Sequence, residues 1–160
     1  MSGRLLPTAV LVLGVAAPAC TGDVDITKTF RIAGVTGGYF DAGIVDGRNK
    51  IIPTVMFSIE KTTDASVRPL SVNVLFKKIA GETEAEWDDV FLQRVEFTEG
   101  NRTPVLTVRP DAGVTGEEPR SEMLKNSQFV DIRAVIFVKQ SSSNWVELAR
   151  YDIPRQLLTP

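Results

Sequence analysis

The sequence predicts an all-β protein, an antiparallel β-sandwich of about seven to eight short strands. Apolar and polar residues alternate along most of the chain after residue 25, which is the pattern of half-buried strands. Polar turn segments separate the alternating runs, and only residues 121–126 have a short helical pattern. A barrel is the alternative, but strands and loops of such unequal length favour two packed sheets.

Two of the clearest strands lie at residues 52–61 and 70–78. In each, every second side chain is apolar, which predicts one face toward the core. The inward residues are Val55, Phe57 and Ile59 in the first strand and Leu70, Val72, Val74 and Phe76 in the second. Residues 62–69 have turn composition, so the two strands are expected to be neighbours in one sheet.

A C-terminal hairpin is predicted from residues 129–139 and 145–153, joined by the polar loop 140–144. One face of its first strand carries Val130, Ile132, Ala134, Ile136 and Val138. Weaker strands are expected at residues 26–35, 39–45, 90–97 and 104–109. Glycines interrupt the first two of these and indicate turns or bulges.

Residues 1–19 have the layout of a secretory signal peptide. A single Arg4 precedes an apolar run, and small residues stand before Cys20. The run is shorter than the roughly 20 residues that a membrane-spanning helix needs. The expected organisation is a signal peptide at 1–19, a short lipid-anchored tether at 20–25 and one sandwich domain at 26–160.

Ala17-Pro18-Ala19-Cys20 resembles the lipobox of bacterial lipoproteins, in which small residues precede a cysteine that is lipidated and becomes the new N-terminus. The resemblance implies a lipid on Cys20 that holds the protein to a membrane of the bacterial cell envelope. Thr21 is not the acidic residue typical of inner-membrane retention, so the resemblance implies the outer membrane, facing the periplasm. Plain export is the alternative, since Ala-x-Ala also precedes ordinary cleavage sites, and the protein is then secreted or at the cell surface.

The block from Pro53 to Phe76 resembles the small Ig-like domains of bacterial lipoproteins of the FxLYD type. In that family a strand ends in a polar turn and is followed by a strand that closes on Phe or Tyr. Val74-Leu75-Phe76-Lys77 stands here in place of the family's Phe-Leu-Tyr-Asp tetrad. The resemblance implies an Ig-like sandwich and a cell-envelope setting, and it implies nothing about catalysis.

The composition removes most catalytic chemistry. The chain has no histidine, and its one cysteine is Cys20, so catalysis by histidine or a thiol and a Cys/His metal site are excluded. No glycine-rich phosphate cradle occurs. A formal net charge of −2 without a basic cluster argues against nucleic acid. We expect no catalytic residues, cofactor, metal or small-molecule ligand.

An acidic stretch, Glu82-Thr-Glu84-Ala-Glu86-Trp-Asp88-Asp89, is interpreted as a solvated connection between strands. Its spacing matches no EF-hand loop. Carboxylate chemistry nevertheless stays open, so a glycan-binding or calcium-binding protein, or a glycosidase, is the alternative function.

The sequence predicts a lipid-anchored interaction or structural module of the cell envelope, an accessory subunit of a membrane-associated complex that binds another envelope protein. Two segments are expected to contact that partner. They are the polar loop before the last strand, with Ser142, Asn144 and Trp145, and the C-terminal segment, with Arg155, Leu157 and Leu158. Loop-borne aromatic residues often contact ligands, which favours Trp145.

Overall fold

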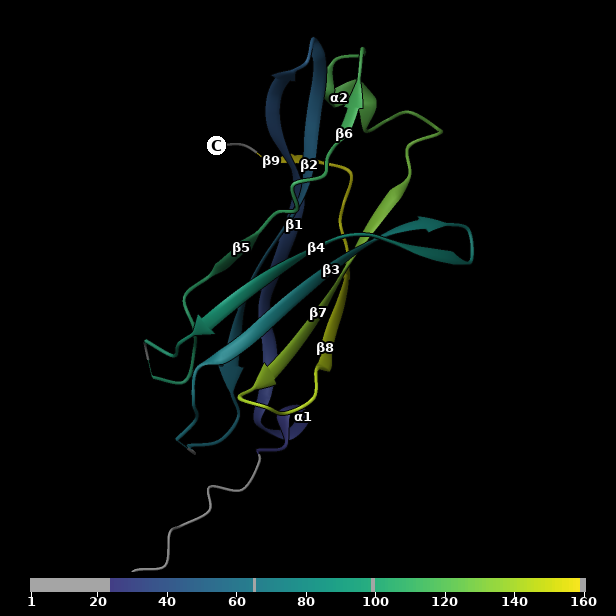
Figure 1. The fold of residues 1–160 in the computed structure, drawn as a ribbon. Coiled ribbons are helices and arrows are strands. Elements are labelled where there is room, and N and C mark those ends of the chain that lie inside the picture. The colour runs from purple at the N-terminus through teal and green to yellow at the C-terminus, as the bar shows by residue number, and fades with distance from the viewer. Residues whose placement is uncertain (1–23, 65, 99, 159–160) are drawn as a thin grey trace, which may run out of the picture.

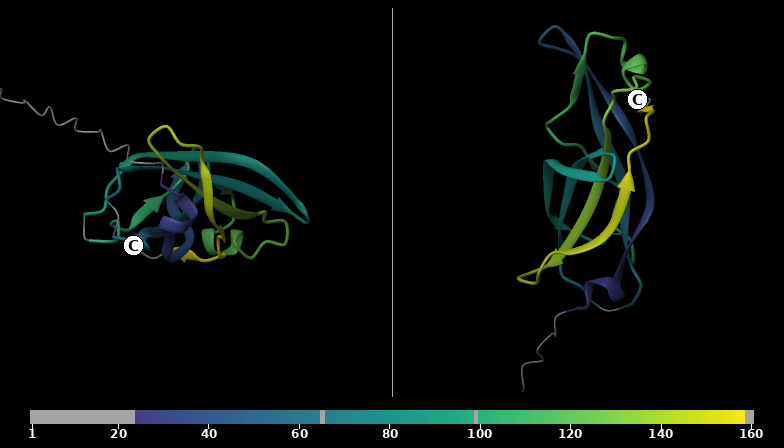
Figure 2. Two further views of the ribbon diagram at one scale, coloured as in Figure 1. Left: turned by 90° about the horizontal axis from the view of Figure 1, so that it is seen from below. Right: turned by 90° about the vertical axis from the view of Figure 1, so that its right-hand side faces the viewer.

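A computed structural model describes residues 24–64, 66–98 and 100–158 as two β-sheets packed face to face (Figure 1). The larger, sheet A, has strand order β5-β2-β1-β9, with β6 also paired to β2, and the smaller, sheet B, has order β4-β3-β7-β8. Figure 2 shows these two layers from two further directions. The prediction of an all-β sandwich is confirmed.

Sheet A consists of β1 (Phe30–Val45), β2 (Arg48–Lys61), β5 (Leu106–Val108), β6 (Val114–Gly116) and β9 (Leu157–Leu158). Sheet B consists of β3 (Leu70–Ala80), β4 (Thr83–Val95), β7 (Asp131–Gln140) and β8 (Val146–Asp152). Two one-turn helices complete the described chain, α1 (Ile26–Thr29) and α2 (Arg120–Met123). The helical turn expected at 121–126 is therefore present one residue earlier and shorter. All strand pairs are antiparallel except β1 with β9, which is parallel.

Strand β1 is one long strand where the sequence suggested two. Its register against β2 shifts twice, at Gly34 (φ 62°) and Gly43 (φ 79°). Both glycines have a left-handed backbone conformation, which costs little without a Cβ atom. The expected break is therefore a pair of bulges within a continuous strand. The expected start at residue 26 is also wrong, because Ile26–Thr29 form α1, capped by the Asp25 carboxylate.

Strands β2 and β3 are not neighbours in one sheet, so that expectation is wrong. Strand β2 pairs with β1, β5 and β6, whereas β3 pairs with β4 and β7. The connection at 62–69 is much longer than the two-residue turn that forces a tight hairpin. It carries the chain from one layer of the sandwich to the other. The predicted hairpin of β7 and β8 is confirmed.

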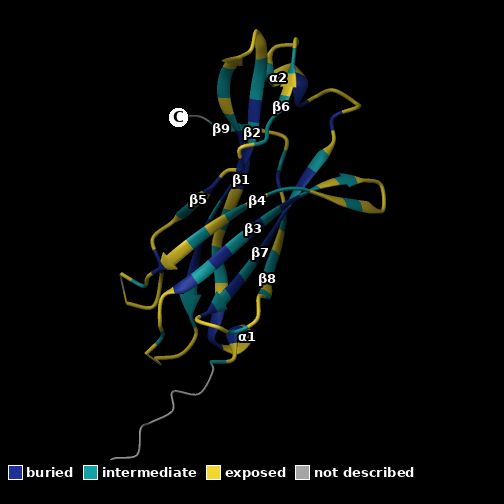
Figure 3. Ribbon diagram, viewed as in Figure 1, coloured by how far each residue is buried: buried dark blue, intermediate teal, exposed yellow. Residues whose placement is uncertain are grey.

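The inward faces of β2, β3 and β7 form the centre of the core, shown in dark blue in Figure 3. Every predicted inward residue of β2 and β3 has 0% exposure, and so does Ile136 of β7. Val130 is the exception on the predicted inner face of the C-terminal hairpin, with 40% exposure, because it precedes the first paired residue of β7. On β2 the outward Thr54 is also fully buried. It accepts a 3.2 Å hydrogen bond from Arg109, whose guanidinium stacks on Phe40.

Ile136→Ala is expected to lower the free energy of unfolding by about 2–5 kcal/mol, because it leaves a cavity at a fully buried site. Val130→Ala is the matched control from the same segment and should change it by less than about 0.5 kcal/mol. Urea unfolding of the two variants measures both values. Equal effects of the two substitutions would contradict the placement of this face in the core.

The C-terminal segment packs against β1 at one edge of sheet A. Tyr39 of β1 donates its backbone N–H to the Gln156 carbonyl at 2.7 Å, and the Gln156 side chain donates to the Gly37 carbonyl at 2.9 Å. A Cβ atom on Gly38 would lie 2.8 Å from the Gln156 carbonyl oxygen and 2.9 Å from Leu158. Glycine at position 38 therefore lets the final strand approach β1 closely.

Tyr39 lies in the core beneath this segment. Its side chain has 0% exposure, and its ring meets Phe129 edge-on at a centroid distance of 5.3 Å. Burial raises the pKa of its phenol well above the ordinary value. The hydroxyl has no hydrogen-bond partner among the described residues. A buried polar group without a partner costs stability.

Tyr39→Phe is therefore expected to leave the free energy of unfolding unchanged or to raise it by up to about 1–3 kcal/mol. Thermal and urea unfolding measure the difference from the wild type. A loss of more than about 1 kcal/mol would show that the hydroxyl is hydrogen-bonded in solution.

Candidate partner-binding face

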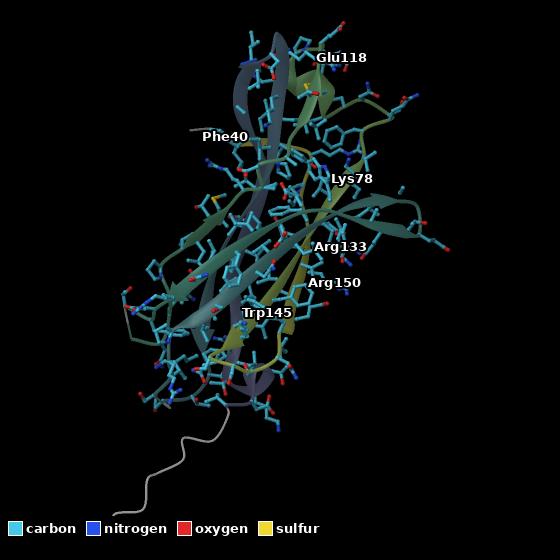
Figure 4. The ribbon with its side chains drawn as sticks, in the orientation of Figure 1. Phe40, Lys78, Glu118, Arg133, Trp145 and Arg150 are labelled. Atoms are coloured by element: carbon cyan, nitrogen blue, oxygen red, sulfur yellow. The ribbon has the colours of Figure 1, made fainter. Side chains whose placement is uncertain are left out.

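The outer face of sheet B carries two exposed aromatic side chains, Phe91 of β4 and Trp145, which directly precedes β8. Phe91 has 43% exposure and Trp145 has 38%. Their rings meet edge-on at a centroid distance of 5.6 Å. The contact joins β4 to the residue directly before β8, and these two strands are the edges of sheet B. Figure 4 labels Trp145 on this face.

Strand register explains why these residues lie together. Asn73 of β3 pairs with Phe91 on one side and with Phe137 of β7 on the other, so these three side chains share one face in one row. Val146 pairs with Val138, which places Trp145 next to Lys139. The Lys139 ammonium lies 4.8 Å from the centroid of the Trp145 ring.

A hollow of about 340 Å³ lies beside the aromatic pair. Its apolar lining consists of Leu75, Phe137 and Trp145, and its polar lining of Asn73, Glu86 and Asp89. The Asn73 amide donates to the Asp89 carboxylate at 3.1 Å. The carbonyl oxygen of the Asn73 side chain is buried and has no hydrogen-bond partner among the described residues.

The other half of the same face is an ion-pair network that joins all four strands. Glu84 of β4 contacts Lys77 of β3 at 3.4 Å, Arg150 of β8 at 3.4 Å, and Arg133 of β7. Arg133 also contacts Asp152 of β8, with one nitrogen–oxygen distance of 3.0 Å. Arg133 and Arg150 are labelled in Figure 4.

This network shifts the pKa values of Glu84, Asp152 and Arg133. Partial burial acts to raise the pKa of Glu84, but hydrogen bonds from Arg133 and Lys77 outweigh it and hold the pKa below its ordinary value. The hydrogen bond from Arg133 also lowers the pKa of Asp152. Asp152 and Glu84 in turn raise the pKa of Arg133 further above its usual range.

The acidic stretch at 82–89 is not a connection between strands, so that interpretation is wrong. Strand β4 begins at Thr83 and includes most of the stretch. Charged side chains suit an edge strand because they oppose pairing with another chain. Several also have specific contacts: Asp88 accepts a hydrogen bond from the Ala112 N–H at 2.9 Å, and Asp89 accepts one from Asn73. Within the described part of the chain, no group of three or more His, Cys, Asp or Glu residues is arranged to hold a metal ion.

The two segments predicted to contact a partner lie in different parts of the molecule. Ser142, Asn144 and Trp145 are exposed at the end of the sandwich that carries α1, whereas β9 lies toward the other end (Figure 1). Leu157 and Leu158 are half-buried in β9 and pair with Tyr39 and Phe40 of β1.

Arg155 has structural contacts in the same segment. Its guanidinium contacts the Asp131 carboxylate at 2.6 Å and donates to the Phe129 carbonyl at 3.0 Å. The hydrogen bond from the Tyr39 N–H to the Gln156 carbonyl holds this segment against β1. The contact of Ser142, Asn144, Arg155, Leu157 and Leu158 with a partner stays a prediction.

Sequence reasoning missed Phe91 and the hollow beside Trp145. The available signal was the alternation at 90–97, in which Phe91 falls on the face opposite Val90 and Leu92. An aromatic residue on the polar face of an edge strand indicates an exposed apolar site.

Cys20 and the residues before it lie outside the described part of the chain. Within the residues that the structure describes, no helix has the length and apolar character needed to cross a membrane. Comparison with protein-family models, with curated proteins and with solved structures found no match.

Arg133→Gln is expected to make stability less sensitive to acid. The pKa values of Glu84 and Asp152 in the folded state lie below their ordinary values of 4.5 and 3.8. The unfolded state therefore binds protons first, so this contribution is present above those ordinary values and is lost as the pH falls through the lowered ones.

Urea unfolding at about pH 7 and about pH 3 measures the effect as the difference between the two free energies. This difference should be smaller for Arg133→Gln than for the wild type. Lys125→Gln is the control, since it removes a surface pair with Glu122 that is separate from the network. An identical difference in the wild type and Arg133→Gln would rule out the network as a source of acid sensitivity.

Proposed function

We propose that the protein is a lipid-anchored interaction module of the bacterial cell envelope, held to a membrane by a lipid on Cys20. Its partner is another envelope protein, which docks on the outer face of sheet B. The observation that carries this proposal is the exposed Phe91–Trp145 pair beside the hollow. Exposed apolar patches with a polar border mark interaction sites.

The position of the aromatic pair suits binding to a protein. Phe91 belongs to β4 and Trp145 directly precedes β8, and the two rings contact each other, so little conformational entropy is lost when a partner orders them. Aromatic residues that become fully buried contribute most of the affinity in many interfaces. The adjoining ion network keeps the other half of the face polar, which limits docking to the aromatic half.

The proposed anchor places this face near the membrane. Figure 1 shows α1 and the loop between β7 and β8 at the same end of the sandwich. Residues 21–25 can extend at most roughly 18 Å, so a lipid on Cys20 would hold this end close to the bilayer. Trp145 follows that loop and would then face a partner that is itself in or on the membrane.

Photo-crosslinking in intact cells of the native host tests the docking face. A benzoylphenylalanine placed at position 91 is expected to form one major adduct with an envelope protein. The matched control is the same group at Ile44, an apolar residue with 71% exposure on β1 near the hairpin tip at the other end of the molecule. Trp145→Ala should weaken the adduct without changing the circular dichroism spectrum. Equal adducts from positions 91 and 44 would contradict a specific docking face.

The anchor is tested separately by metabolic labelling with radioactive palmitate. The wild type should incorporate the label and partition into detergent, and Cys20→Ser should lose both properties. An unlabelled, soluble wild type would favour plain secretion and would leave the docking result unaffected.

A further inference from the structure

The hollow beside Trp145 differs from the rest of the same face in its charges. On the network half, Glu84, Glu147 and Asp152 each pair with an arginine. At the hollow, Glu86 and Asp89 have no basic partner among the described residues, and no basic side chain lines it. The face therefore has one half whose carboxylates pair with arginines and one half whose two carboxylates have no basic partner in the described part of the chain.

The polar groups of the hollow are almost all acceptors of hydrogen bonds. The carboxylates of Glu86 and Asp89 only accept when ionised. One N–H of the Asn73 amide donates to Asp89, and the side-chain carbonyl oxygen of Asn73 is buried, with no donor among the described residues. Among the six lining side chains, the remaining donors are the second N–H of the Asn73 amide and the indole N–H of Trp145.

The orientation of the Asn73 amide follows from its surroundings. Turning the amide over would bring its carbonyl oxygen against the Asp89 carboxylate and would leave the nitrogen without an acceptor. The unsatisfied acceptor is therefore a property of the site.

This set of groups selects a ligand that donates hydrogen bonds and carries positive charge. A guanidinium has five N–H donors and no acceptor, and its plane both stacks on aromatic rings and forms paired bonds to carboxylates. A sugar hydroxyl accepts as well as donates and would find few donors here. The Trp145 ring already has the Lys139 ammonium 4.8 Å from its centroid, which shows that its environment accommodates a cation.

The size of the hollow is compatible with one long side chain. Its volume of about 340 Å³ lies near the lower end of the range for ligand sites, roughly 300–1,000 Å³. The apolar lining from Leu75 and Phe137 would contact the methylene stem of an arginine. Its guanidinium would lie between Trp145 and the two carboxylates.

We propose that this hollow receives an arginine side chain of the partner protein, bound by Glu86 and Asp89 beside Trp145. The proposal rests on the proposed function, since it identifies the chemistry of the docking partner. The two carboxylates become neutralised when the complex forms.

The test is a nuclear magnetic resonance titration of the purified protein with three short capped peptides. They share the sequence Gly-Leu-X-Leu-Gly, and X is arginine, lysine or citrulline. Citrulline has nearly the shape of arginine without its charge. The arginine peptide should shift the Trp145 indole and Asn73 side-chain resonances and should bind more tightly than the citrulline peptide by roughly tenfold or more.

Glu86→Gln should weaken arginine binding by roughly tenfold, since it removes one charge and keeps the shape of the side chain. Glu122→Gln is the control, a surface carboxylate away from the hollow. Asp89→Asn is a second variant whose folding is checked first, because it alters the bond to Asn73. Trp145→Phe identifies the indole resonance.

Equal binding of the arginine and citrulline peptides, no resonance shift with any peptide, or no effect of Glu86→Gln would overturn the arginine site. Shifts produced by tetra-N-acetylchitotetraose that exceed those of the arginine peptide would assign the hollow to a glycan instead. The titration tests only the arginine site, and the crosslink from position 91 tests the proposed function. An adduct that forms without any arginine preference would keep the docking face and reject the arginine site.

Discussion

The antiparallel ladder between β3 and β7 sets the position of every other feature of sheet B. It runs from the pair of Leu70 with Gln140 to the pair of Ile79 with Asp131 without a bulge. Since side chains alternate between the two faces of a strand, a slip of one residue would exchange the core face for the outer face. Burial of Val74 and Ile136, which are direct partners in this ladder, opposes such a slip. The same register places Asn73 beside Phe137 and Lys77 beside Arg133 on the outside.

The edge strands of sheet B are irregular where the central ladder is regular. The pairing of β4 with β3 and that of β8 with β7 both contain register shifts. Bulges twist an edge strand and reduce its tendency to add another strand. One of the shifts in β4 lies at Trp87, whose ring has the Lys78 ammonium 4.8 Å from its centroid. The irregular edge β4 therefore carries Phe91 and most of the acidic stretch, while the regular central ladder fixes the register of the sheet.

The sequence predicted the parts of the fold that depend on local pattern. The inward faces of β2, β3 and β7 and the β7–β8 hairpin follow from alternation and from a polar loop. The sequence did not predict which strands pair when the connection is long, as between β2 and β3. It also did not predict β9, because the pairing of Leu157 with Tyr39 depends on a contact between distant parts of the chain. The sequence did not predict a strand at residues 82–89 because acidic residues have low strand propensity. An edge strand nevertheless often carries charged side chains, which oppose pairing with another chain.

Within the candidate site, the sequence predicted Trp145 as a contact residue but did not predict the residues that line the hollow beside it. The acidic stretch shows why: its carboxylates have different roles that only the three-dimensional structure separates. Glu84 connects the start of β4 to the arginines of β7 and β8. Asp88 accepts from the Ala112 N–H, and Asp89 holds the Asn73 amide. Glu86 has no such contact among the described residues and lines the hollow.

These contacts also explain how an unpaired carboxylate can be held in place without a partner. The ion network fixes β4 on one side of Glu86, and the bond between Asp89 and Asn73 fixes it on the other. A cation that enters the hollow would therefore meet groups that are already positioned, and less conformational entropy would be lost on binding. The network half of the face supplies rigidity, and the unpaired half retains the charge that a partner can neutralise. Under the proposed function, stability and recognition would depend on the same strand, with the two roles separated along its length.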